Sequence, residues 1–171
     1  SLDKGLWKNL QKIAPDGSLP EEYSIAIIRY LRGDKKALNN TNKDVKAAAK
    51  DIRTWLDGIA KDAKDAGYGD IRIKNYFPRE WDRKAIENNK EEFQKLLAKD
   101  LKIPESEALE VIDGMLNLNN ELYKSHSNLL THRRKLELLD DNAYEKFMST
   151  DLVSILANYG LNAANTIQTK L

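Results

Sequence analysis

The stretch Asn75-Tyr76-Phe77-Pro78-Arg79-Glu80-Trp81-Asp82 places three aromatic rings around one proline. Pro78 lacks a backbone N–H and has a fixed φ. Helical geometry is also unfavourable for the residue that precedes a proline. We therefore expect an extended aromatic connector near residues 69–79. A helix is expected to open at Trp81, because apolar residues recur behind it at helical spacing.

Most of this stretch is predicted to anchor the connector in the core, because large aromatic side chains usually serve packing. Phe93 follows Trp81 by twelve residues, more than three helical turns, so we expect the two rings to meet different neighbours. The neighbours expected for these two rings are Trp55 and the face Tyr144–Met148. A docking surface for another protein is the alternative use of the stretch. The predicted anchor consists of Tyr76, Phe77, Pro78, Arg79, Trp81 and Asp82.

Apolar residues at helical spacing also predict helices on both sides of the aromatic stretch. Pro20 with two glutamates marks one helix start, Thr41 or Asn42 caps a second, and Pro104 precedes a third. Asp140-Asp141-Asn142 is expected to cap another helix that carries Tyr144, Phe147 and Met148. The sequence therefore predicts an all-α fold, an irregular multi-helix bundle. We expect one helical module over 1–171, with 1–68 and 75–171 as its sub-units.

The composition excludes several classes of protein. The 171 residues include no cysteine, so disulfides and thiol chemistry are ruled out. The net charge of +1, from 28 basic and 27 acidic residues, creates no global field toward nucleic acid or anionic membranes. No apolar run approaches the length of a membrane span. Because the chain opens on Ser1 without a signal-like apolar stretch, we expect it to be part of a longer protein.

Catalytic and metal-binding patterns are weak in this chain. His126 and His132 lie six residues apart, which fits poorly the i, i+4 spacing of zinc ligands on a helix. Glu80 and Glu92 are candidates for the carboxylate pair of a glycosidase. This indication is weak, because a chain with 27 acidic residues always contains some pair of carboxylates. No phosphate-binding glycine loop or nucleophile motif is present. We expect no catalytic residues, no metal and no cofactor.

The densest basic cluster is His132-Arg133-Arg134-Lys135. Four cationic or protonatable side chains in a row can contact phosphate, which makes a DNA contact one interpretation of this cluster. Acidic residues follow at Glu137, Asp140 and Asp141, so a solvated or ion-paired face is the alternative.

Three blocks of the chain, in order, resemble one family. The aromatic stretch with the helix behind it is the central block, and Leu19-Pro20-Glu21-Glu22 through Tyr30-Leu31-x-Gly33 lies upstream. The downstream block runs from His132-Arg133-Arg134-x-Leu136 through Asp140, Phe147, Asp151 and Tyr159. Together they resemble segments of large tailed-phage proteins, the multi-domain polyvalent or internal virion proteins that are carried in the capsid or ejected with DNA.

The resemblance implies a helical linker or scaffold module, located in the virion or, after ejection, in the host cytoplasm. Its partners would be other virion proteins or other domains of the parent chain. Enzymatic domains of such proteins generally lie elsewhere, and no catalytic residue carries over to this segment. Two other hypotheses stay open: a small helical peptidoglycan-cleaving enzyme, and a DNA-contacting module that uses residues 132–135.

Overall fold

The computed structural model describes residues 4–68, 77–116, 136 and 139–160. Helices dominate these residues, which confirms the all-α fold class. Within the described residues no β-strand forms, and backbone pairing between extended segments is limited to one antiparallel bridge, Trp81 with Met148. Of the expected connector at 69–79, only the last three residues are described, and they are not helical. No helix in the described part of the chain is long and apolar enough to cross a membrane.

The chain divides into two compact units, and unit 2 is inserted into unit 1. Unit 1 comprises Ser1–Glu80 and Ser149–Leu171, whereas unit 2 comprises Trp81–Met148. These boundaries differ from the sub-units 1–68 and 75–171 that the sequence suggested. The difference arises because Phe77 and the helical residues 152–160 both pack into the core of unit 1.

The helices of unit 1 begin and end where local chemistry dictates. Pro20 precedes the first residue of its helix, where a missing N–H costs nothing. The Asn42 side chain accepts a hydrogen bond from the Val45 amide at 2.9 Å, which confirms the predicted cap. The last of these helices ends in a π-helical turn, η1 (Lys64–Tyr68), where Gly67 takes φ 92°. The three helices are α1 (Lys4–Ile13), α2 (Glu21–Leu31) and α3 (Lys43–Ala63).

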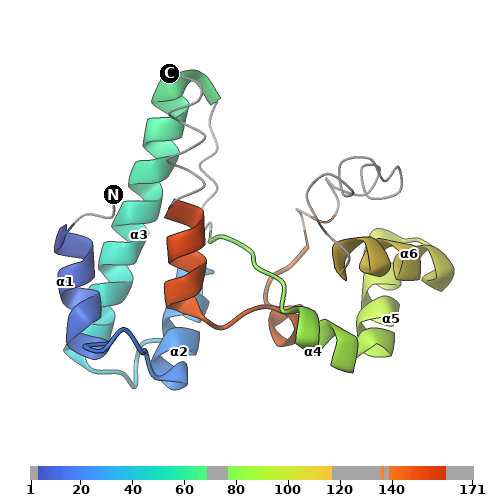
Figure 1. The fold of residues 1–171 in the computed structure, drawn as a ribbon, viewed down its shortest axis with the longest axis horizontal. Coiled ribbons are helices and arrows are strands. Elements are labelled where there is room, and N and C mark those ends of the chain that lie inside the picture. The colour runs from blue at the N-terminus through green and yellow to red at the C-terminus, as the bar shows by residue number, and fades with distance from the viewer. Residues whose placement is uncertain (1–3, 69–76, 117–135, 137–138, 161–171) are drawn as a thin grey trace. The chain divides into compact units, whose positions relative to one another are not determined.

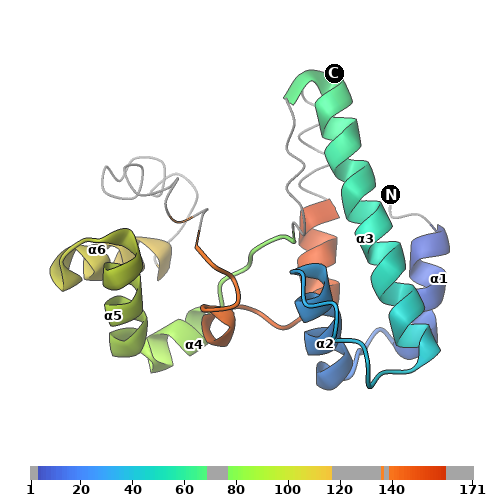
Figure 2. The same cartoon turned by 180° about the vertical axis from the view of Figure 1, so that it is seen from behind.

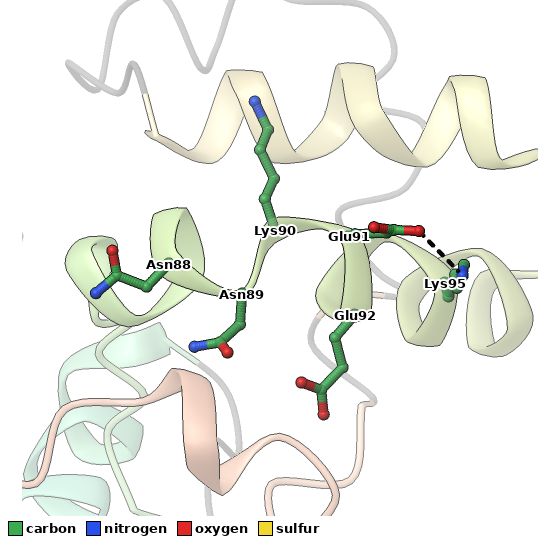
Figure 3. A pocket seen from close by; sticks show the side chains of 6 residues that line it. All are labelled: Asn88, Asn89, Lys90, Glu91, Glu92 and Lys95. Atoms are coloured by element: carbon green, nitrogen blue, oxygen red, sulfur yellow. Dashed lines mark ion pairs between the residues drawn. The ribbon is translucent and has the colours of Figure 1, made fainter.

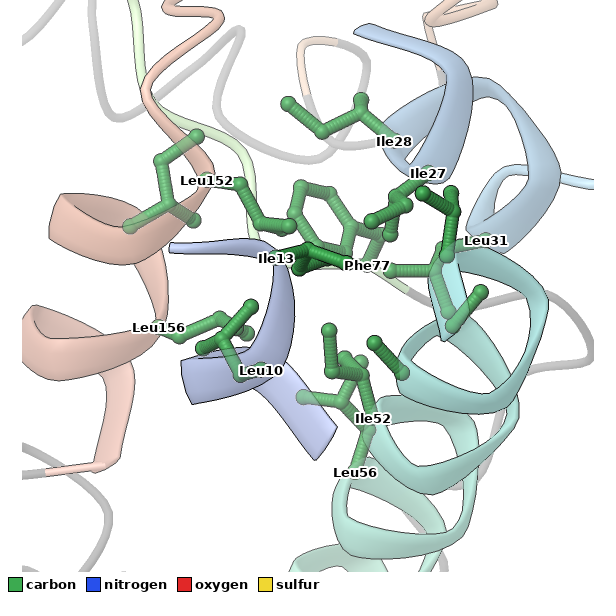
Figure 4. Packing of buried hydrophobic residues seen from close by; sticks show 14 of the residues in the cluster. Leu10, Ile13, Ile27, Ile28, Leu31, Ile52, Leu56, Phe77, Leu152 and Leu156 are labelled. Carbon is green, nitrogen blue, oxygen red and sulfur yellow. The ribbon is translucent and has the colours of Figure 1, made fainter. Parts of the chain in front are cut away.

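The core of unit 1 lies between these helices and the returning segment 152–160. Figures 1 and 2 show α1 running beside α3, with α2 and the helical residues 152–160 completing the group. Figure 4 shows the Phe77 ring among aliphatic side chains from all four helices. Each such side chain contributes about 1.5–3 kcal/mol on burial. The labelled members of the cluster are Leu10, Ile13, Ile27, Ile28, Leu31, Ile52, Leu56, Phe77, Leu152 and Leu156.

The described residues of unit 2 form three α-helices, and the expectation of a single long helix from Trp81 onward is wrong. The first helix begins at Arg83, and a break at Asn89 separates it from the next. Asn89 takes φ −131° and ψ 35°, and its side-chain amide donates to the Ala85 carbonyl at 2.9 Å. That side chain satisfies a carbonyl of the last turn, so the helix can stop there without an unpaired acceptor. The helices are α4 (Arg83–Asn88), α5 (Lys90–Leu101) and α6 (Glu105–Leu116).

The prediction of an α-helix directly after Asp140-Asp141-Asn142 is also wrong, because turns occupy this region. Asp140 accepts a hydrogen bond from the Asn142 amide at 3.0 Å, so its carboxylate stabilises a turn. A short 3₁₀ turn, η2 (Glu145–Phe147), follows, and Met148 is extended in the bridge with Trp81. The helix of this region starts at residue 152, where Asp151 accepts from the Ser154 amide at 3.1 Å.

Candidate interaction site

The aromatic stretch serves both units, one residue after another. Phe77 is 4% exposed and lies in the core of unit 1, beside the buried Pro78. The Arg32 guanidinium of α2 lies 5.6 Å from the centre of the Phe77 ring, within the range of a cation–π interaction. Arg79 and Glu80 are half-exposed, and Tyr76 lies outside the described residues.

Trp81 belongs to an aromatic cluster in unit 2. Its ring centre lies 5.5 Å from that of Phe93 and 6.0 Å from that of Tyr144, with near-perpendicular planes. These are the edge-to-face geometries that aromatic pairs prefer. The expected contact with the Tyr144–Met148 face is confirmed. The expectation that Trp81 and Phe93 meet different neighbours is wrong, because Trp81 precedes α4 and the break at Asn89 lets α5 return Phe93 to it.

A hydrogen bond anchors one ring of this cluster, and one expected neighbour lies outside it. Tyr144 is fully buried, and its hydroxyl donates to a carboxylate oxygen of Asp100 at 2.7 Å. Trp55, the other neighbour expected for the Trp81 and Phe93 rings, has an edge-to-face contact with Tyr159 within unit 1, with ring centres 6.3 Å apart.

Asp82 ends the stretch as the cap of α4. Its carboxylate accepts a hydrogen bond from the Ala85 amide at 3.1 Å, and its own amide donates to the Phe147 carbonyl at 2.9 Å. On the unit 1 side of the boundary, the Ser149 amide donates to the Glu80 carbonyl at 2.8 Å. The outgoing and returning chain segments are therefore hydrogen-bonded to each other at the points where the chain leaves and re-enters unit 1. Such pairing holds the two chain segments side by side within each unit.

Sequence reasoning missed a serine that holds the returning segment in unit 1. Ser24 of α2 is 3% exposed, and its hydroxyl donates to the Thr150 carbonyl and accepts from the Leu152 amide. The sequence did contain a sign of this role, because Ser24 lies at helical spacing from Ile27, Ile28 and Leu31 and so falls on the apolar face of α2. A polar residue at such a position needs a buried hydrogen-bond partner.

The depression at the break between α4 and α5 does not have the features of a catalytic pocket. It holds about 510 Å³, is largely open to solvent, and is lined by Asn88, Asn89, Lys90, Glu91, Glu92 and Lys95 (Figure 3). Glu92 is 57% exposed and forms an ion pair with Lys146 at 2.6 Å. Catalytic carboxyl groups usually lie in an enclosed, mostly apolar pocket, whereas this carboxylate lies in an open depression.

The remaining candidates offer no site in the described chain. The basic cluster His132, Arg133, Arg134 and Lys135 lies outside the described residues, as does His126. Across the described ranges, no group of three or more His, Cys, Asp or Glu side chains is arranged to hold a metal ion.

Comparisons with models of known protein families, with curated proteins and with solved structures found no match to this chain.

Proposed function

We propose that this chain is a non-catalytic structural and interaction module of a phage virion protein or DNA-ejection protein. The resemblance of three ordered sequence blocks carries the proposal. The structural roles of the central block support it, because Phe77, Trp81 and Asp82 are engaged in packing and helix capping. In this proposal the segment has a mechanical role: it connects two helical units and leaves chemistry to other domains or proteins.

The partners in this proposal are other virion proteins or other domains of the parent chain. The test uses purified particles of the phage whose genome encodes this sequence and an antibody raised against residues 1–171. We expect the antibody to detect a polypeptide in intact particles and to lose that signal in capsids emptied by receptor-triggered ejection. Absence of the polypeptide from intact particles would exclude a virion role. Retention in emptied capsids would exclude ejection and leave a structural role in the particle.

The enzyme alternative has a direct test. Purified peptidoglycan is incubated with the chain, and release of soluble fragments is followed by chromatography, with the Glu92→Gln variant in parallel. We expect no release by either protein, because the Glu92 carboxylate is ion-paired and solvated. Fragment release by the unaltered chain that is lost in a glutamate variant would make the chain an enzyme and overturn the proposal.

A further inference from the structure

Three lysines form a row on one side of α3. Lys43, Lys46 and Lys50 are spaced by three and four residues, so they fall within roughly 60° of each other around the helix axis. Lys43 and Lys50 are exposed and Lys46 is half-exposed. Asp44 and Asp51 fall on another side of the helix, and Asp51 accepts a hydrogen bond from Asn9 of α1. The row therefore presents positive charge without an interleaved acid.

The α3 row differs in its ion pairs from four cationic side chains of unit 2. Within the described residues, none of the three forms an ion pair with an acidic side chain. In unit 2, by contrast, four cationic side chains are paired with acids. The pairs there are Arg83–Glu87, Lys90–Asp113, Lys95–Glu91 and Lys146–Glu92, with N–O distances of 3.0, 2.8, 3.1 and 2.6 Å. The charge of the α3 row is thus available to an external partner.

Two more lysines lie in the connection that leads to α3. Arg53 donates to the Leu31 carbonyl at 3.1 Å, which fixes the end of α2 beside the third turn of α3. The connection 32–42 must run back from there to the start of α3, a course that Figure 2 shows. Lys35 and Lys36 are exposed on this connection, and no ion pair joins either to an acid of the described residues. We call Lys35, Lys36, Lys43, Lys46 and Lys50 the basic face.

The charge count shows that this region stands apart from the rest of the chain. Residues 29–53 contain eight basic and three acidic side chains, a net of +5, whereas the whole chain carries only +1. All other residues together therefore carry −4. By unit, unit 1 has 17 basic and 13 acidic side chains, and unit 2 has 11 and 14. A balanced total thus conceals a local positive surface on unit 1, and local surfaces are what attract polyanions.

We propose that the basic face binds the phosphate backbone of a nucleic-acid duplex without reading its sequence. Successive lysines of the α3 row are separated by about 4.5–6 Å along the axis, so they form a straight line of point charges. A duplex presents a dense row of phosphates to such a line. The α3 positions between and beside the lysines on this side are Ala47, Arg53 and Thr54, and Asp57, two turns beyond Lys50, is paired with Arg53 at 3.4 Å. They offer no ring for stacking on single-stranded bases and no large apolar group for insertion into a lipid surface.

This proposal is independent of the virion assignment, because it rests on the charges of α3 and its preceding connection alone. It also differs in location from the cluster at 132–135, which lies in unit 2. Failure of the particle test above would leave it standing, and its own failure would leave the virion role standing.

The test is fluorescence anisotropy of a fluorescein-labelled, random-sequence DNA duplex titrated with the full chain at several salt concentrations. With five contacts, affinity should fall about 10²- to 10³-fold between about 50 and 200 mM salt. The variant Lys43→Gln/Lys46→Gln/Lys50→Gln should reduce the magnitude of the log–log salt slope by about 2.7, since each phosphate contact contributes about 0.9. Far-ultraviolet circular dichroism checks that this surface variant remains folded.

The matched control removes the same number of charges from unit 2. Lys84, Lys99 and Lys102 are all exposed and form no ion pair with the described acids, and their replacement by glutamine should leave affinity and salt slope unchanged. Equal effects of the two triple variants would overturn the proposal, because they would reflect net charge rather than the basic face. No binding of the duplex at about 50 mM salt would also overturn it. Binding of phosphatidylserine vesicles without binding of the duplex would assign the face to lipid instead.

Discussion

The Ser24 hydroxyl accepts a hydrogen bond from the Leu152 amide at 3.0 Å, across 128 positions of sequence. The same hydroxyl donates to the Thr150 carbonyl. One buried side chain on α2 therefore satisfies both a donor and an acceptor of the segment that returns from unit 2. With Leu152 and Leu156 buried beside it, this pair of hydrogen bonds fixes where the last described helix enters unit 1.

Replacing Ser24 by alanine should destabilise unit 1 by about 1–3 kcal/mol, because the buried Leu152 amide would lose its partner. Urea unfolding followed by circular dichroism measures the change as a lower midpoint. Ser18→Ala is the control, since Ser18 is exposed and donates its backbone amide to Asp16. It should stay within about 0.5 kcal/mol of the unaltered chain. Equal midpoints for the two variants would show that water replaces the serine hydroxyl.

Replacing Trp81 by alanine should destabilise unit 2 by about 2–3 kcal/mol. This is slightly less than for a fully buried tryptophan, because Trp81 is half-exposed. The loss comes from its contacts with Phe93 and Tyr144. Hydrogen exchange read by mass spectrometry should show faster exchange in peptides of α5 and α6, with little change in α1 and α3. Trp55→Ala, which removes the contact with Tyr159, should instead speed exchange in α1 and α3 and leave α5 and α6 little changed. Unchanged protection together with lost binding to a virion protein would make Trp81 a docking residue.

Local signals predicted much of the helical structure. The helix starts at Glu21, Lys43 and Glu105 follow from Pro20, Asn42 and Pro104, because each start depends on chemistry within a few residues. The break at Asn89 could not be read in the same way. No glycine or proline marks it, and it depends on a side chain that bonds a carbonyl of the preceding turn and on Phe93 meeting Trp81.

The division into units could not be read from the sequence because it depends on contacts far apart in the chain. The aromatic stretch reads as one anchor, yet Phe77 packs in unit 1 and Trp81 in unit 2. Periodicity shows that residues 152–160 have an apolar face but not which helices it meets. The basic face does not stand out in the sequence for a related reason: Lys43, Lys46 and Lys50 are not adjacent along the chain and line up only once the chain is helical.

Two glycines with open surroundings should respond in opposite ways to alanine. Nothing lies within 4 Å of a Cβ at Gly58 or at Gly17. Gly58 lies inside α3, so Gly58→Ala should stabilise the chain by about 0.5–1 kcal/mol through its higher helix propensity. Gly17 has φ 80°, where an L side chain is strained, so Gly17→Ala should destabilise by about 1 kcal/mol. Thermal unfolding measures both, and shifts of the same sign would contradict the assigned backbone geometries.

The last prediction concerns the insertion of unit 2. Because the Ser149 amide bonds the Glu80 carbonyl at 2.8 Å, the two ends of unit 1 are already adjacent. Replacing residues 81–148 by a short glycine-serine linker should therefore leave unit 1 folded, since short loops of about 2–5 residues connect such adjacent segments readily. The core residues of unit 1, including Phe77, Leu152 and Leu156, all remain in this deletion variant.

The expected outcome is a helical circular dichroism spectrum and one cooperative thermal transition. The matched control is truncation after Met148, which removes Leu152 and Leu156 from the core and leaves Ser24 buried without its two partners. That chain should lose cooperative unfolding of unit 1, because buried leucines each contribute about 2–5 kcal/mol and a domain has only about 5–15 kcal/mol in total. If the deletion variant unfolds while the truncated chain stays cooperative, unit 1 depends on the inserted unit and not on the returning helix.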